Sequence, residues 1–243
     1  MSHTGRWGEK ASNLYRADYA RKYREHDEEL HGANACGVEI YGAFCAWLRE
    51  VCGRFDRPIA ALDLGCGTGR YFRALAGVRS LVGIDASAAM LAEAERPVGA
   101  DEITVPAIEL IVGDFVTHTF APGRFDLVYS IGVLAEHTPL DIALVEQVSR
   151  WLAPGGRFVF TTVHPDSASV PPTIGRRLGR LALPVAAGPL QRYLHARITA
   201  GGLYADEALI HSLLDRLFVI ESLTRLQSEA HLHCLCVARK AAA

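Results

Sequence analysis

The chain has 243 residues, of which half are hydrophobic and 21% are charged, and its formal net charge is −2. A chain of this size can bury roughly 70–75% of its unfolded surface in one sizeable domain, which excludes an intrinsically disordered protein. The near-neutral charge gives no basic footprint for nucleic acid, so we expect no nucleic-acid partner.

The expected location of the protein rests on targeting and membrane signals in the sequence. No stretch approaches the ~20 apolar residues that a membrane span needs, and the polar residues 1–6 do not resemble a signal peptide. We therefore expect a cytoplasmic protein with no membrane partner. The six cysteines include no C-x-x-C pair, so reduced thiols in the core are expected.

Two helices are expected before the first strand. Residues 7–29 are polar, but Tyr15, Tyr19 and Tyr23 repeat every four residues and would form a stripe on one helical face. That stripe could pack on the domain, because tyrosine has an apolar body beside its polar tip. Residues 38–52 carry apolar side chains at intervals of three and four, which predicts an amphipathic helix.

Residues 59–70 organise the rest of the chain. The apolar run 59–64 ends in Gly65, Gly67 and Gly69, and the helix-compatible segment 71–75 follows at once. This pattern predicts a strand, a tight turn and a helix start. Glycine suits such a turn because positive φ is cheap without a Cβ and because a ligand can then lie on the backbone.

An acidic residue follows at the spacing of a ribose-binding site. Asp85 ends the next apolar run about twenty residues further on, where a carboxylate can accept both ribose hydroxyls. The glycine spacing is G-x-G-x-G, which differs from the dinucleotide pattern G-x-G-x-x-G. The sequence therefore predicts a ligand that contains a nucleoside, and disfavours a nicotinamide oxidoreductase.

Strands and helices then alternate. We expect helices at 88–95 (with Ser87 as N-cap), 141–152 and 205–217. Strands are expected at 108–112, 125–130, 157–163, 218–226 and 231–238, and the strand at 108–112 should be short and buried. Such alternation requires a mostly parallel sheet, because parallel neighbours need crossover connections. The ligand then lies above the carboxyl ends of the strands, where Gly65, Asp85, Asp114 and Ser130 fall.

The segment 164–204 is too long for an ordinary connection, which favours a functional role. It contains arginines but no acidic residue between positions 167 and 205, the arginines being Arg176, Arg177, Arg180, Arg192 and Arg197. Such an excess of positive charge could attract an anionic group of a substrate, or could be a solvated basic face.

Five motifs in order carry a family resemblance: Leu62–Gly69, Val82–Ser87, Val112–Phe115, Phe125–Gly132 and Leu152–Phe158. Together they resemble the successive motifs of class I S-adenosylmethionine-dependent methyltransferases. The resemblance implies an α/β fold with a Rossmann-like, seven-stranded, mostly parallel sheet, helices on both faces, and a last strand that is antiparallel and lies inside the sheet. It also implies a single domain, composed of an N-terminal helical cap (1–56), a cofactor-binding core (57–163), a substrate lid inserted after the fifth strand (164–204), and a C-terminal helix and strand pair (205–243).

The same resemblance implies the cofactor, S-adenosyl-L-methionine, and where it binds. The glycine turn would lie against the methionine part with Asp63 near its amino group, Asp85 would hold the ribose, and Asp114 beside Phe115 would hold the adenine. The residues expected to bind the cofactor are Asp63, Gly65, Cys66, Gly67, Gly69, Asp85, Ala86, Met90, Gly113, Asp114, Phe115, Ser130 and Ile131.

Methyl transfer needs alignment, exclusion of water and, where the acceptor carries a proton, a base. We expect His137, His164 and His231 to converge near the reacting group, with His137 and His164 as the first candidates for the base and Glu136 as an alternative. The pairs His231-x-His233 and Cys234-x-Cys236 face opposite sides of one strand, so no metal site is expected there.

The sequence thus predicts a methyltransferase that acts on an oxygen or nitrogen of a small, largely apolar metabolite, and the arginines of 164–204 would suit an anionic group on it. A carbon methyltransferase and a catalytically silent cofactor-binding module stay open as alternatives. So does the choice between a monomer and a homodimer.

Overall fold

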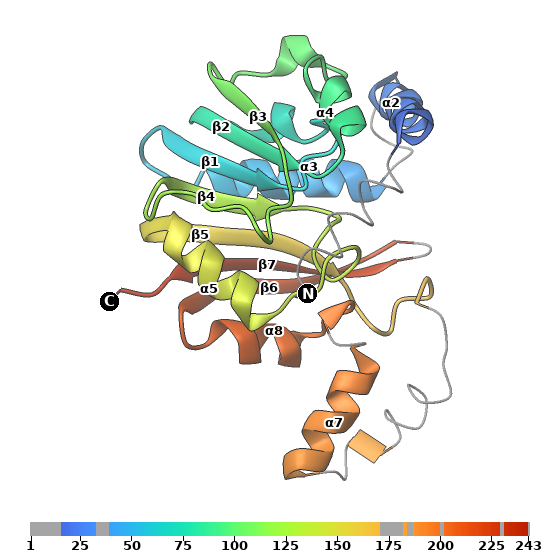
Figure 1. The fold of residues 1–243 in the computed structure, drawn as a ribbon, viewed down its shortest axis with the longest axis vertical. Coiled ribbons are helices and arrows are strands. Elements are labelled where there is room, and N and C mark those ends of the chain that lie inside the picture. The colour runs from blue at the N-terminus through green and yellow to red at the C-terminus, as the bar shows by residue number, and fades with distance from the viewer. Residues whose placement is uncertain are drawn as a thin grey trace.

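The computed structural model describes residues 16–32, 39–170, 182–183, 187–199, 202–228 and 231–242. One seven-stranded sheet runs through this part of the chain, with helices on both of its faces (Figure 1). The strands are β1 (Ile59–Leu64), β2 (Val78–Asp85), β3 (Ile108–Val112), β4 (Phe125–Ser130), β5 (Leu152–Val163), β6 (Phe218–Gln227) and β7 (Leu232–Lys240). The helices are α2 (Ala17–Gly32), α3 (Glu39–Cys52), η1 (Phe72–Ala74), α4 (Ala88–Ala94), η2 (Ala100–Glu102), α5 (Ile142–Trp151), α7 (Gly188–Ile198) and α8 (Glu207–Leu214). None of the helices in these ranges is long and apolar enough to cross a membrane.

The strand order is β3-β2-β1-β4-β5-β7-β6. Strand β1 pairs in parallel with both β2 and β4, so the crossovers leave it in opposite directions and open a crevice at the carboxyl ends of these strands. Strand β7 is antiparallel to both β5 and β6 and lies between them. The expected sheet, including its internal antiparallel strand, is confirmed.

Each face of the sheet has its own hydrophobic core. On one face α5 and α8 pack through residues such as Val145, Val148 and Ile210. On the other face α3 packs through Leu48 and Val51. The expected start of α4 is also confirmed, since Ser87 accepts a hydrogen bond from the Met90 N–H, and so is the strand pair that follows α8.

Three local expectations are wrong. The helix expected after the glycine turn is only the 3-10 turn η1, because the chain must turn back at Gly77 to enter β2 at Val78. Strand β3 is not buried, because it forms an edge of the sheet and leaves Val112 61% exposed. Strand β5 begins at Leu152, five residues earlier than expected, through an irregular pairing with β4.

The two ends of the insertion between β5 and α8 lie next to each other. The Ala205 N–H donates to the Val163 carbonyl at 3.1 Å, which ties the two ends of the segment together, and the Leu140 N–H donates to the Gly202 carbonyl at 3.0 Å. Helix α7 lies far from α2 along the long axis of the molecule (Figure 1). Arg176, Arg177 and Arg180 lie outside the described residues, so the substrate lid proposed for this segment stays a prediction.

The close packing of β2 against the glycine turn gives a stability prediction. A Cβ at Gly83 would lie 2.9 Å from the Cys66 sulfur and 3.1 Å from Leu110, so Gly83→Ala should lower the free energy of unfolding by about 1–3 kcal/mol through overpacking. Denaturant unfolding measures this. Gly113→Ala is the matched control, because its Cβ would meet nothing nearer than 3.5 Å. Equal stabilities of the two variants would contradict the packing argument.

Candidate active site

A cavity of about 340 Å³ lies at the carboxyl ends of the strands and is roofed by α2 and α3. It receives side chains from both halves of the sheet. The described residues that line it are Tyr23, His26, Leu30, Ile40, Tyr41, Phe44, Asp63, Gly65, Cys66, Gly67, Thr68, Arg70, Tyr71, Asp85, Ala86, Met90, Asp114, Phe115, Ile131, Gly132, Val133, Glu136, His137, Thr138, His231 and His233.

The glycine turn is shaped by positive φ angles and held by Asp85. Gly65 and Gly67 have φ of +76° and +55°, and a Cβ at Gly65 would clash with Val133 at 2.6 Å. The Asp85 carboxylate accepts the Gly67 N–H at 2.9 Å through one oxygen and the Ser87 N–H at 2.8 Å through the other. A carboxylate has about four acceptor sites, so Asp85 keeps capacity for two further donors, as two ribose hydroxyls would be.

The end of β3 presents an acceptor without a partner. Asp114 accepts the Val116 N–H at 2.9 Å through Oδ1, while its Oδ2 is buried with no hydrogen-bond partner among the described residues. A buried carboxylate oxygen without a donor is costly, and an amino group such as that of adenine would supply one. The neighbouring Phe115 offers a ring for stacking.

A second buried acid lies at the end of β1. Asp63 is 3% exposed, and burial, helped by the negative charge of Asp85, raises its pKa to about 8. Such a carboxyl group gains most from a cationic partner, because a positive charge favours its ionised form. An ammonium group beside the glycine turn would be that partner.

Helix α2 is held over the cavity by polar contacts. Asp27, 5% exposed, accepts the Thr68 hydroxyl proton at 2.5 Å and pairs with the Arg70 guanidinium, so the helix is anchored on the glycine turn. Arg24 donates to Glu93 of α4 at 3.1 Å. Tyr23 of the predicted tyrosine stripe lines the cavity, whereas Tyr15 lies outside the described residues.

The loop after β4 supplies two candidates for a base. Glu136 and His137 both line the cavity, with 3.9 Å between Glu136 Oε1 and His137 Nε2. Burial raises the pKa of Glu136 to about 7. A carboxyl group with this pKa can take up a proton near neutral pH.

The structure brings most of the predicted site residues together, but not all. Among the described residues, Gly69, Gly113, Ser130 and His164 do not line the cavity. Ser130 is fully buried and donates to the Leu64 carbonyl at 2.8 Å, which fixes β4 to β1. His137 and His231 converge on the cavity as expected, whereas His164 does not, so we carry Glu136 and His137 forward as candidate bases and leave His164 out.

Sequence reasoning missed several lining residues. Tyr41 and Phe44 belong to the helix predicted at 38–52, whose periodicity indicates packing and gives no sign of a ligand. Thr68 and Arg70 stand between and after the glycines, where the glycine spacing does not mark them as ligand contacts. His233 could have been found, because its spacing from His231 puts both on the same face of one strand.

Comparisons with known proteins give a matching family profile and several similar proteins. The profile of the family described as "Methyltransferase domain" matches residues 61–156. The chain is similar to the malonyl-(acyl-carrier protein) O-methyltransferase of Enterobacter lignolyticus, at 34% identity over 151 residues, 61% of this chain and 51% of that protein. It is also similar to the ubiquinone biosynthesis O-methyltransferase of Burkholderia vietnamiensis, at 30% identity over 63% of this chain and 66% of that protein.

The fold of the whole chain has solved counterparts. The magnesium protoporphyrin IX methyltransferase of Synechocystis, solved with bound S-adenosylmethionine, superimposes with a TM-score of 0.61 at 16% identity and covers 97% of each chain. This likeness shows the fold. The chain spans about half or less of the length of three of the curated relatives it matches, between 38% and 51%.

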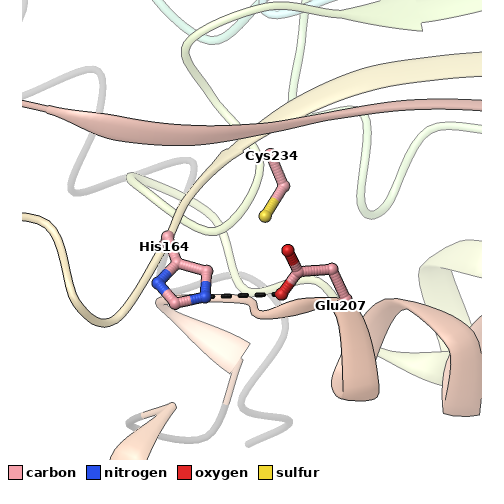
Figure 2. A group of neighbouring side chains, drawn as sticks. All are labelled: His164, Glu207 and Cys234. Carbon is pink, nitrogen blue, oxygen red and sulfur yellow. Dashed lines mark ion pairs between the residues drawn. The ribbon is translucent and has the colours of Figure 1, made fainter. Parts of the chain in front are cut away.

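A second group of titratable side chains lies outside the cavity, where the insertion meets the sheet. His164, Glu207 and Cys234 place their polar atoms within 4.8 Å of one another (Figure 2). The Asp166 N–H donates to His164 Nδ1 at 3.1 Å, so the neutral ring carries its proton on Nε2, which faces Glu207 at 3.4 Å. Arg225 pairs with both oxygens of Glu207. These contacts give His164 and Glu207 partners within the protein.

The Arg225 contact gives a pH-dependent stability prediction. It lowers the pKa of Glu207 from 4.5 to about 2, so the folded state favours the ionised form. The resulting stabilisation is present above the unfolded pKa of about 4.5 and is lost as the pH falls toward 2. Because Glu207 is partly exposed, Glu207→Gln should cost only about 1 kcal/mol at pH 7.

Thermal melts of the two proteins between pH 2 and pH 7 should converge at the acid end, and Glu146→Gln, at an exposed position of α5, should melt as the wild type does. A difference that stays constant with pH would contradict the ion pair. A rise in Tm with Zn²⁺ that Glu207→Gln abolishes would instead show a metal site.

Proposed function

Residues 61–156 belong to the methyltransferase-domain family, and from this premise we propose that the chain transfers a methyl group from S-adenosylmethionine to an oxygen or nitrogen of a small molecule. The observation that carries the proposal is the cavity itself. It joins three carboxylates with remaining hydrogen-bonding capacity, at the ends of β1, β2 and β3, to the space beside Glu136 and His137. Two of the relatives are named as a malonyl-(acyl-carrier protein) O-methyltransferase and a ubiquinone biosynthesis O-methyltransferase, and these names support an oxygen acceptor.

The residues of this chain fit S-adenosylmethionine. In the proposal Asp63 pairs with the α-ammonium group, Asp85 accepts the ribose hydroxyls, and the orphaned Oδ2 of Asp114 accepts the adenine amino group. Glycine at 65 and 67 lets the methionine portion lie against the backbone. Cys66, Ala86, Met90 and Ile131 complete the walls of this half of the cavity.

When bound, S-adenosylmethionine supplies an electrophilic methyl group that is displaced in line from its sulfur. The contribution of the protein is to align the acceptor, exclude water and accept a proton. Helices α2 and α3 exclude water by covering the cavity, and the Asp27 contacts keep α2 in place. Glu136 takes the acceptor proton, with His137 beside it to stabilise the negative charge. A cytoplasmic location and a monomeric or homodimeric state stay predictions from the sequence.

Calorimetry with S-adenosylhomocysteine tests the cofactor half of the proposal. Wild-type protein should bind it, and Asp85→Asn should weaken binding by about 10–100-fold, because the variant loses charge-assisted hydrogen bonds to the ribose. Asp101→Asn, at an exposed position of η2, should leave the Kd unchanged. No binding at millimolar concentration would overturn the proposal, and binding without transfer of labelled methyl to any compound in a cell extract would favour a silent binding module.

The raised pKa of Glu136 gives a prediction for turnover. The carboxylate is the basic form, so kcat/KM, which reports the pKa of the free enzyme, should rise with pH and reach half its maximum near pH 7. Glu136→Gln should lower kcat by about 100-fold and remove this inflection, while His137→Gln should keep it. A wild-type rate and profile in Glu136→Gln would exclude Glu136 as the base.

A further inference from the structure

Two histidines line the cavity from the start of β7 and have free hydrogen-bonding capacity. The rings of His231 and His233 have their centroids 5.5 Å apart, and both line the cavity. The Nδ1 atom of each ring is buried and has no hydrogen-bond partner among the described residues. Buried polar atoms in folded proteins are nearly always paired, so two orphans side by side on a cavity wall indicate a place for a polar ligand.

His233 is an uncharged group in this setting. It is 6% exposed, and burial together with the neighbouring His231 lowers its pKa to about 4. The edge-on contact with Phe44, at 5.4 Å between centroids and 90° between planes, fixes the ring. A neutral imidazole can accept a hydrogen bond from a hydroxyl or N–H group at one nitrogen and donate at the other.

The sheet order places this pair away from the residues proposed for the cofactor. Asp63, Asp85 and Asp114 stand at the ends of β1, β2 and β3. His233 lies on β7 and His231 immediately precedes that strand, on the far side of β4 and β5. The loop that carries Glu136 follows β4, between the two groups. The histidines therefore stand in the half of the cavity that is left for the acceptor.

The other walls say what kind of acceptor fits. Tyr23, Tyr41 and Phe44 present aromatic rings to the cavity. Arg70 is the one arginine or lysine among the described lining residues, and it stands at the glycine turn, paired with Asp27. An anionic group near the histidines would meet Glu136 and the neutral imidazole of His233, whereas a flat uncharged ring with hydroxyl groups would find both stacking surfaces and hydrogen-bond partners.

Resting on the function proposed above, we propose that His231 and His233 form the acceptor-binding subsite, and that the acceptor is an uncharged aromatic ring that carries at least one hydroxyl group. The histidines bind a hydroxyl of the ring through Nδ1 and so orient the reacting oxygen toward Glu136. They are binding and positioning residues, and the methyl group and the proton follow the path described above.

The test uses catechol as the probe, with 1,2-dimethoxybenzene and hexanoate as comparison compounds. Each is titrated into protein already loaded with S-adenosylhomocysteine, while the ¹⁵N signals of the histidine rings are followed by NMR. Catechol should shift the Nδ1 signals of His231 and His233 and bind at least tenfold more tightly than either comparison compound. His233→Phe and His231→Phe should each weaken catechol binding at least tenfold and leave the Kd of S-adenosylhomocysteine within twofold. His211→Phe, at an exposed position of α8, should change neither value.

The outcomes separate this subsite from the cofactor assignment. Catechol affinity that is unchanged in both variants, tighter binding of hexanoate, or no binding of catechol to the loaded protein at 20 mM would each overturn the subsite while leaving the methyltransferase proposal in place. Failure to load S-adenosylhomocysteine, measured first, would overturn both. If a thermal melt shows that His233→Phe does not fold, the catechol affinity of His231→Phe tests the subsite, because His231 is less buried than His233.

Discussion

The site depends on the way one carboxylate joins two strand ends. Asp85 closes β2 and accepts an N–H from Gly67, in the turn after β1, and another from Ser87, at the start of α4. Because each carboxylate oxygen of Asp85 accepts from a different backbone N–H, the glycine turn, β2 and α4 are held in fixed positions relative to one another. Burial raises the pKa of Asp85, but these two bonds oppose that effect and favour the ionised form, which is the form that can accept further donors.

The cover of the cavity is stabilised in a different way. Helix α2 is polar overall and contributes few residues to the core, so packing alone does not hold it. Asp27 instead bonds to Thr68 and Arg70 of the glycine turn, and Arg24 bonds to α4. The glycine turn therefore both forms part of the cavity floor and anchors α2 above it, and a change in the turn would disturb both.

The sequence predicted those parts of the fold that local chemistry determines. The glycine turn, the N-cap at Ser87 and the alternation of strands and helices follow from φ preferences, side-chain capping and periodicity, which act over a few residues. The missed features depend on contacts distant in sequence. Ser130 stands at the right strand end but turns to the Leu64 carbonyl, and His164 is held by Glu207, 43 positions away in the chain. No local pattern distinguishes those partners from a ligand.

The direction of β7 brings two chemically different groups of side chains to one cavity. In a wholly parallel sheet, only the carboxyl ends of strands would reach the cavity. Asp63, Asp85 and Asp114 lie at such ends. Because β7 is antiparallel to β5, its first residues arrive at the same edge, and they bring His231 and His233. The acidic residues suit a cationic, hydroxyl-rich nucleoside, whereas the imidazoles and aromatic rings suit an uncharged polar ring. Since the two groups lie on opposite sides of β4 in the sheet order, substitutions at His231 and His233 can change the proposed acceptor half while the carboxylates proposed for the cofactor keep their places.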